Sequence, residues 1–236
     1  MTSATNRRKP LALISAYEVG ASCFMEPVMP WRVDGPQGPR EHMAADEALV
    51  YGGRVYTWDA PAVTLGRFQD PARVMAAHPH LPHAVRPTGG KAVLHGHDLT
   101  IGLAVPWEWA NWSEAERRSV RLVYRRLAEP LVKALNQAGV AAALAEQTPF
   151  VRSAGKVADC FAHIAPNDIV DPKTGRKVCG CALALRESGV LVQCSLPVRL
   201  PDPEVANLFG AQVIYGEYPH LEAAALADAL ASAFSP

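Results

Sequence analysis

The sequence predicts one domain that combines β-strands with α-helices. Three observations lead to this prediction: short apolar runs bounded by glycine or proline, longer segments with helical periodicity, and no Pro/Gly/Ser-rich linker between them. A chain of 236 residues is long enough for one large domain or two small ones. Hydrophobic residues make up 49% of it, which is ample for a core. The missing linker favours one domain.

The first half of the chain predicts strands around one helix. WRVD (31–34) is typical of a short strand, and EHMAADEALVYG (41–52) of a helix that ends at Gly52 and Gly53. RVYTW (54–58) and AVTLG (62–66) predict a hairpin that turns at residues 59–61. Residues 1–28 show little pattern. We interpret them as an N-terminal extension, and 29–236 as the domain.

The second half predicts a strand, a long helix, more strands and a final helix. LTIGLAVP (99–106) is an apolar strand, and Ser113 with Glu116 forms a capping box. The helix that it starts carries an apolar face, contains Pro130 and ends at Gly139; that face comprises Val120, Val123, Leu127, Leu131 and Leu135. NDIV (167–170), RKVCGCALAL (176–185) and SGVLVQCSL (188–196) predict strands, and 220–234 a helix.

Charge and cysteine content restrict the possible partners and location. The chain has 23 basic and 23 acidic residues, which argues against a nucleic-acid or anionic-membrane surface. Its five cysteines are an odd number without a disulfide-scaffold spacing, which fits a reducing compartment. No apolar run approaches the ~18 residues of a membrane span. We therefore expect a cytoplasmic protein with no membrane or nucleic-acid partner.

The stretch RPTGGKAVLHGHDLT (86–100) concentrates unusual residues. Two adjacent glycines, Gly89 and Gly90, allow backbone conformations that side chains forbid, and Lys91, His95 and Asp98 follow within ten residues. Loops on a rigid scaffold often carry binding groups. From spacing alone, a ligand-facing loop and an elaborate hairpin remain equally compatible with this stretch.

A second informative stretch runs from 151 to 198. Lys177 begins a strand of small apolar residues, so its ammonium either reaches solvent or faces a negative or polarised ligand. Cys160 is by default a small buried hydrophobe, and it becomes a nucleophile only if a nearby cation lowers its pKa.

Other clusters of possible metal ligands favour structural interpretations. Cys179 and Cys181 face the same side of a strand and could chelate together, but with Cys194 they lack a zinc spacing, so we interpret all three as core residues. The irregular histidines at 78, 80 and 83 are not expected to bind zinc, and we predict no metal site. The arginine-rich face of residues 117–126 is interpreted as a solvated helix surface rather than a docking surface.

Four motifs in order resemble the lipoate/octanoate protein ligase and transferase superfamily, which shares the biotin/lipoate A/B protein ligase catalytic domain. They are WRVD with HMAADEAL, RVYTWDAPAVTLGRFQD, RPTGGKAVLHGHDLT and the strand ending GRKVCG, and the resemblance runs from Trp31 to the C-terminus. It implies an α+β fold with mixed β-sheets flanked by helices. It also implies transfer of an eight-carbon acyl group to a lysine of a lipoyl-domain protein.

The resemblance further implies roles for individual residues. Cys160 and Lys177 are expected to be catalytic: the cysteine would form an acyl-enzyme, and the lysine would stabilise the oxyanion. His95 is expected to orient the acyl group or move protons. The substrate-binding residues implied are Arg86, Thr88, Gly89, Gly90, Lys91, His95, Asp168 and Gly180.

Two features place the chain nearest the cysteine-dependent octanoyltransferases. Lys91 stands where ATP-dependent ligases have a third glycine, and Cys160-Phe161 matches the transferases' cysteine context. The resemblance then implies octanoyl-acyl carrier protein as donor and no cofactor. The acceptor would be a lipoyl-domain protein such as glycine-cleavage H protein or a 2-oxoacid dehydrogenase E2.

Departures from the transferase pattern keep alternatives open. The usual Gly-Ser-Ala-Gln is Gly-Cys-Ala-Leu at 180–183, the usual Gln-His-Gly is Gln-Cys-Ser at 193–195, and Asn167-Asp168 is closer to the ligases. An ATP- and Mg-dependent lipoate-protein ligase is the first alternative. A non-catalytic relative that binds a lipoyl domain or acyl group, and an amidotransferase acting between carrier proteins, are the others.

Overall fold

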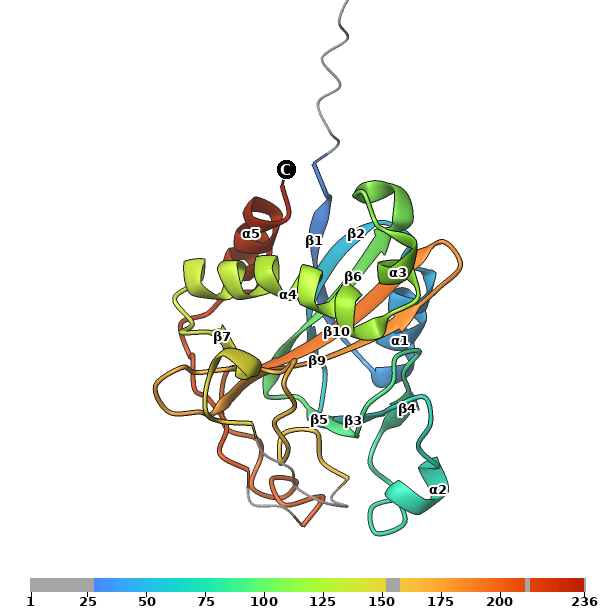
Figure 1. Cartoon of the computed structure of the whole chain (residues 1–236). Coiled ribbons are helices and arrows are strands. Elements are labelled where there is room, and N and C mark those ends of the chain that lie inside the picture. The colour runs from blue at the N-terminus through green and yellow to red at the C-terminus, as the bar shows by residue number, and fades with distance from the viewer. Residues whose placement is uncertain (1–27, 152–157, 211–212, 236) are drawn as a thin grey trace, which may run out of the picture.

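The structure, a computed structural model, describes residues 28–151, 158–210 and 213–235. Within these ranges two mixed β-sheets are flanked by helices (Figure 1), so the predicted α+β fold is confirmed. The N-terminal extension predicted for 1–28 lies, apart from Val28, outside the described residues. In the described part of the chain, no helix has the length and apolar character needed to cross a membrane.

The larger sheet contains seven strands among the described residues, in the order β1-β2-β6-β10-β9-β8-β7. β1 and β2 are parallel, and the other neighbours are antiparallel. The strands are β1 (Trp31–Gln37), β2 (Gly52–Trp58), β6 (Asp98–Pro106), β7 (Ala143–Leu144), β8 (Ile169–Val170), β9 (Lys177–Leu185) and β10 (Gly189–Pro197). The central strands β6 and β10 are almost wholly buried, as their apolar sequences predict.

Two long helices cover one face of this sheet (Figure 1). They are α4 (Val120–Gln137) and α5 (Ala223–Ala233), which pack against each other as well as against the strands. Leu127 and Leu131 of α4, one turn apart, are fully buried against alternate residues of β6 and β10 such as Ile101 and Val192. This packing forms the main hydrophobic core.

A smaller three-stranded sheet of the described chain lies at the other face. Its order is β4-β3-β5, from β4 (His83–Val85), β3 (Ala62–Leu65) and β5 (Val93–His95). The helices α1 (Pro39–Ala48) and α2 (Pro71–Val74) accompany it, while α3 (Glu114–Arg117) and the 3₁₀ turns Trp107–Trp109 and Ala145–Gln147 connect elements elsewhere. The Thr88 hydroxyl, in the loop after β4, donates to the Gln193 side chain in β10 at 2.7 Å. The two sheets therefore face each other across a shared polar network.

Three local predictions are wrong in ways that tertiary contacts explain. β2 and β3 do not form a hairpin, because β2 pairs with β1 and β6 while β3 pairs with β4 and β5. The turn at 59–61 instead carries the chain from one sheet to the other. Helix α1 ends at Ala48 rather than Gly52, since Gly52 and Gly53 are taken into β2, where Gly53 pairs with Trp31.

The third correction concerns the capping box. Ser113 and Glu116 do cap a helix, but it is only the four-residue α3. The Ser119 side chain then accepts a hydrogen bond from the Leu122 backbone N–H and starts α4 separately. Val120, predicted for the apolar face, is 54% exposed because it lies in this new first turn.

Candidate active site

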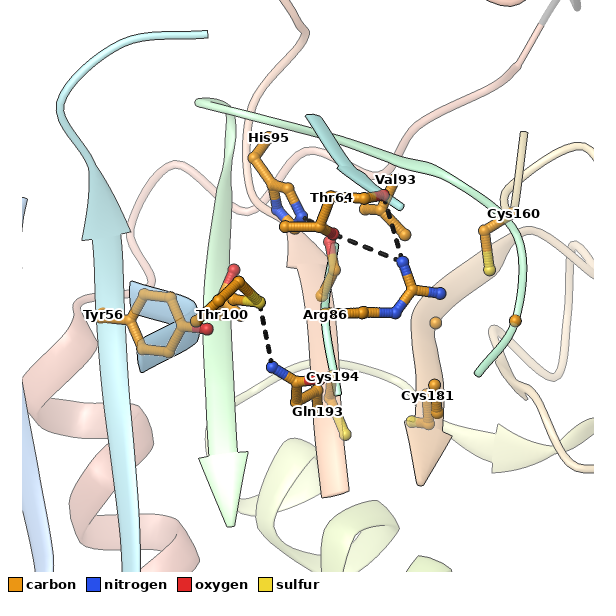
Figure 2. Close-up of a pocket in the computed structure, with 15 residues that line it drawn as sticks. Tyr56, Thr64, Arg86, Val93, His95, Thr100, Cys160, Cys181, Gln193 and Cys194 are labelled. Carbon is orange, nitrogen blue, oxygen red and sulfur yellow. Dashed lines mark hydrogen bonds between the residues drawn. The ribbon is translucent and has the colours of Figure 1, made fainter. Parts of the chain in front are cut away.

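A small pocket of about 40 Å³ lies between the two sheets, within about 410 Å³ of space that includes its open mouth (Figure 2). Residues of β3, β5 and the 86–92 loop form one wall, and residues of β2, β6, β9 and β10 form the other. The pocket is lined by Met43, Tyr56, Thr64, Arg86, Gly90, Val93, His95, Thr100, Cys160, Gly180, Cys181, Ala182, Gln193, Cys194 and Ser195. Much of this lining is apolar or carries hydroxyl groups, as in sites for small organic ligands.

Arg86 organises the glycine loop from inside. Its guanidinium is buried and donates to the carbonyls of Thr64 at 3.1 Å, Gly89 at 2.6 Å and Lys91 at 2.7 Å. Gly90 has φ +92°, and a Cβ there would lie 2.9 Å from the Arg86 Nη2 atom. The left-handed backbone and the close approach both require glycine. Arg86 thus holds the loop in shape while it lines the pocket.

A chain of buried hydrogen bonds fixes this loop to the larger sheet. The Arg86 Nε donates to the Thr88 hydroxyl at 3.1 Å, which donates to the Gln193 side-chain oxygen. The Gln193 amide donates to Asp46 in α1 at 2.6 Å, and Asp46 also accepts from Arg54 at 2.7 Å. A buried network in which every group has a partner specifies one arrangement. The loop therefore has a fixed position above β10.

His95 belongs to a second buried cluster, centred on Asp98. The His95 Nδ1 lies 2.8 Å from the Asp98 Oδ2, and its Nε2 lies 2.8 Å from the Thr64 hydroxyl. The hydroxyls of Thr100 and Ser195 donate to the same carboxylate oxygen at 2.9 and 2.6 Å. Both ring nitrogens are thus engaged by protein groups. This favours the orienting role predicted for His95 over proton transfer.

Lys177 and Cys160 meet at another part of the pocket. The Lys177 ammonium is buried and lies 3.4 Å from the Cys160 Sγ; it also donates to the Cys160 carbonyl at 3.0 Å and the His163 carbonyl at 3.3 Å. Its ion-pair partner is Asp168, at 2.9 Å. Of the two sequence interpretations of Lys177, exposure to solvent is therefore wrong. The ammonium faces inward, against a sulfur.

The charges of this cluster influence one another strongly. Burial opposes the Lys177 charge, but Cys160 and Asp168 outweigh it and raise the pKa of Lys177 above its ordinary value. Burial also raises the pKa of Asp168, and the Lys177 ammonium offsets this only in part. Lys177 therefore stays charged at neutral pH, as a cation that can stabilise a thiolate must.

Backbone contacts position Cys160 beside the loop. The Cys160 N–H donates to the Ala92 carbonyl at 2.9 Å, and the Ala92 N–H donates to the Ala158 carbonyl at 3.0 Å. On the other side, a Cβ at Gly180 would lie 3.5 Å from the Cys160 Sγ and 3.3 Å from the Lys177 Cε. Gly180 thus leaves space beside Cys160 and Lys177.

The structure brings most of the predicted site residues together. Cys160, Arg86, Gly90, His95 and Gly180 line the pocket. Thr88, Gly89 and Lys91 contact Arg86, and Lys177 contacts Cys160. Asp168 lies one contact further away, paired with Lys177. Two of the predicted residues, Gly89 and Lys91, contribute carbonyl oxygens to Arg86.

Several lining residues were missed by sequence reasoning. Tyr56, Thr100, Gln193 and Ser195 all come from strands of the larger sheet. A signal existed in β10, where Gln193 and Ser195 alternate as polar residues in an otherwise apolar strand. The histidines at 78, 80 and 83 do not form a metal-ligand cluster among the described residues.

The structure is thus an α+β protein with a pocket between its two sheets, lined by a cysteine that contacts a buried lysine. Residues 39–212 match the family of lipoyl protein ligase A/B catalytic domains, and the chain belongs to that family. The lipoate/octanoate superfamily resemblance is thereby confirmed.

Named relatives include octanoyltransferases LipM. The LipM of an Exiguobacterium species is 30% identical over 190 residues, 72% of this chain and 66% of the relative. That of Clostridioides difficile is 30% identical over 64% of this chain and 58% of the relative, and that of Bacillus subtilis 28% identical over 76% and 69%. The chain thus matches slightly under two thirds of the length of the first of these relatives.

Solved structures show the same fold at lower identity. A lipoate-protein ligase A bound with ATP superposes with a TM-score of 0.61 at 20% identity, covering 87% of this chain and 83% of that protein. A bipartite lipoate protein ligase of Thermoplasma acidophilum, whose structural study included its E2 lipoyl domain, gives 0.53 at 18% identity, with coverage of 87% and 81%.

Proposed function

We propose that this protein is an acyltransferase that moves an octanoyl group from octanoyl-acyl carrier protein to a lysine of a lipoyl-domain protein, through a thioester on Cys160. The observation that carries the proposal is the 3.4 Å contact between the Cys160 Sγ and the buried Lys177 ammonium at the pocket. The octanoyltransferase relatives support the acyl group and the reaction class.

The proposed first step forms the acyl-enzyme. The Cys160 thiolate attacks the thioester carbonyl, the carbon–sulfur bond to the carrier breaks, and the carrier thiolate takes a proton as it leaves. The Lys177 ammonium would stabilise the thiolate before attack and the oxyanion during it. The acyl chain would enter the pocket between Val93 on one wall and Ala182 on the other.

The proposed second step forms the amide. The uncharged amine of the acceptor lysine attacks the Cys160 thioester, loses a proton and releases the Cys160 thiolate, so the enzyme returns to its starting state. Both steps use an acyl group that is already activated as a thioester, so the proposed reaction needs neither ATP nor another cofactor. The lipoyl-domain acceptor agrees with the E2 lipoyl domain studied with the Thermoplasma ligase. A cytoplasmic location is part of the same proposal.

The test compares two donors. The chain is incubated with apo lipoyl domain and either octanoyl-acyl carrier protein or free octanoate with Mg-ATP, and acceptor mass is measured. We expect modification with the carrier-bound donor alone. Intact-mass analysis without acceptor should show a hydroxylamine-labile octanoyl adduct on the chain.

Cys160→Ser and the matched control Cys23→Ser separate the reactive thiol from other cysteines. We expect Cys160→Ser to lose the adduct and the transfer, and Cys23→Ser to keep both. Strict dependence on ATP would instead identify a ligase, the function that the Asn167-Asp168 motif favours. Binding of the acyl group without transfer from either donor would identify a non-catalytic relative.

A further inference from the structure

Three cysteine side chains of β9 and β10 meet at the floor of the pocket, and two of them, Cys181 and Cys194, line it. Cys179 and Cys181 alternate along β9, and Cys181 lies directly across from Cys194 in β10. The three Sγ atoms all lie within 4.8 Å of one another, and those of Cys179 and Cys181 are 3.7 Å apart. Cys179 and Cys194 are 1% exposed and belong to the main core.

A tyrosine from α4 completes the cluster. Tyr124 is 2% exposed and belongs to the same core cluster as Cys179 and Cys194. The Tyr124 hydroxyl lies within hydrogen-bonding reach of the Cys181 thiol. The Tyr124 oxygen is therefore placed to act as a donor beside the sulfurs.

The donor set fits one kind of ligand. Thiolates select soft ions, chiefly Zn²⁺ and Cu⁺. A Zn–S bond of about 2.3 Å in tetrahedral geometry puts two sulfurs about 3.8 Å apart, close to the separation of Cys179 and Cys181. Three thiolates around Zn²⁺ carry a net charge of −1, whereas around Cu⁺ they carry −2. Zinc is favoured because buried net charge is costly.

We propose that Cys179, Cys181 and Cys194 form a Zn²⁺ site with the Tyr124 oxygen as fourth donor. Binding replaces three thiol protons, which leave to solvent, with three zinc–sulfur bonds. The site would tie β9, which also carries Lys177 and Gly180, to β10 and α4. This inference does not rest on the proposed function, since it concerns metal binding rather than acyl transfer, although Cys181 and Cys194 also line the pocket.

Tyr124 also lines a cavity at the protein surface. A surface cavity of about 970 Å³, including open space at its mouth, is lined by Arg121, Tyr124, Arg125 and Glu146 among others. The Arg125 guanidinium pairs with Glu146 across it. The three cysteines do not line this cavity, whereas Cys181 and Cys194 line the pocket between the sheets.

The experiment measures metal binding directly. The reduced full-length chain, treated with chelator, is titrated with Zn²⁺ in competition with a chromogenic chelator and, separately, with Co²⁺ under spectroscopic observation. We expect one Zn²⁺ per chain, and Co²⁺ bands of thiolate charge transfer together with an intense tetrahedral d–d transition. Cys181→Ala should lose both signals, whereas Cys160→Ala and Cys23→Ala, which remove thiols outside the cluster, should keep them.

Tyr124→Phe tests the fourth donor while preserving core volume. We expect it to weaken Zn²⁺ binding by at least about tenfold, the scale of losing a supporting group at a metal site. Far-ultraviolet circular dichroism verifies that each variant folds. The proposal is overturned if the reduced wild-type chain binds no Zn²⁺ in the titration. It is also overturned if folded Cys181→Ala and Cys179→Ala bind as wild type does.

Discussion

Two buried aspartates flank the pocket, and their surroundings differ. Asp98 accepts hydrogen bonds from His95, Thr100, Ser195 and the Gly96 backbone, on both carboxylate oxygens. Asp168 accepts from Lys177 and the Ala165 backbone, both on one oxygen. Both side chains are almost inaccessible to solvent. Comparing the two sites therefore shows how the number of hydrogen-bond donors changes the pKa of a buried carboxyl group.

The pKa values of the two groups move in opposite directions. Burial alone would raise the pKa of Asp98, but His95 first, and then His97 and Ser195, hold it well below its ordinary value. Burial raises the pKa of Asp168 because its single ammonium partner offsets less. The saturated Asp98 cluster thus fixes a wall of the pocket. The Asp168 cluster holds an ammonium whose other neighbour, Cys160, would change charge in the proposed reaction.

The largest expected effect is on the free energy of unfolding, at Asp98, whose carboxylate accepts four hydrogen bonds. Asp98→Asn keeps the shape of the side chain but removes the charge that four donors face. We expect a loss of about 3–5 kcal/mol, the usual cost of breaking a buried charged network. Urea unfolding followed by circular dichroism measures it. The control, Asp202→Asn, changes an exposed aspartate and should leave the unfolding free energy within about 0.5 kcal/mol of wild type.

Lowering the pH extends this test, because it should reduce the stability that the Asp98 carboxylate contributes. A carboxyl group whose folded pKa is depressed contributes stability above its unfolded pKa of about 3.9 and loses it as pH falls through the folded pKa. The difference between the unfolding free energies of wild type and Asp98→Asn should narrow progressively as pH falls below about 5. A difference that stays constant to the lowest pH at which wild type folds would contradict the depressed pKa of Asp98.

The second effect is on the proposed catalysis, at the cluster of Asp168, Lys177 and Cys160. Lys177→Met removes the cation beside Cys160, and we expect octanoyl transfer to fall by about 10²–10³-fold, as when an oxyanion donor is lost. Because that variant leaves Asp168 unpaired, the double variant Lys177→Met/Asp168→Asn removes both charges. It should recover stability without recovering activity. Lys173→Met, at an exposed turn, is the matched control with unchanged turnover.

Recovered activity in the double variant would contradict the role of Lys177 and make the loss a matter of folding. The Asp168 cluster would then differ from the Asp98 cluster in stability only, and not in a catalytic role. Circular dichroism and urea unfolding of all three variants distinguish the two cases.

The sequence located the central residues of both clusters but not the donors that come from distant strands. His95 and Asp98 lie in one short stretch, and Cys160 and Lys177 in another, so local motifs locate both. Ser195 donates to Asp98 from β10, 97 positions further along the chain. That contact depends on the β6–β10 register, in which Ser195 stands opposite Thr100.

The fold shows the same division between local and long-range information. Apolar runs predicted β6, β9 and β10 closely, because burial along a strand is visible in its own residues. The separation of β2 and β3 into different sheets depends on partners elsewhere in the chain, and the turn at 59–61 has the same residues in either arrangement. Turn chemistry therefore could not distinguish a hairpin from a crossing between sheets.

The smallest expected effect concerns this long-range donor. Ser195→Ala removes one of four hydrogen bonds to Asp98, and we expect a loss of about 2 kcal/mol, the scale of one hydrogen bond to a charged group. Octanoyl transfer should change less than in Lys177→Met, because Thr100 and His95 still hold the carboxylate. Urea unfolding and steady-state transfer measure the two effects on the same preparation. If Ser195→Ala lost as much stability as Asp98→Asn, then the hydrogen bonds would not act separately, and the Asp98 cluster would behave as one cooperative unit.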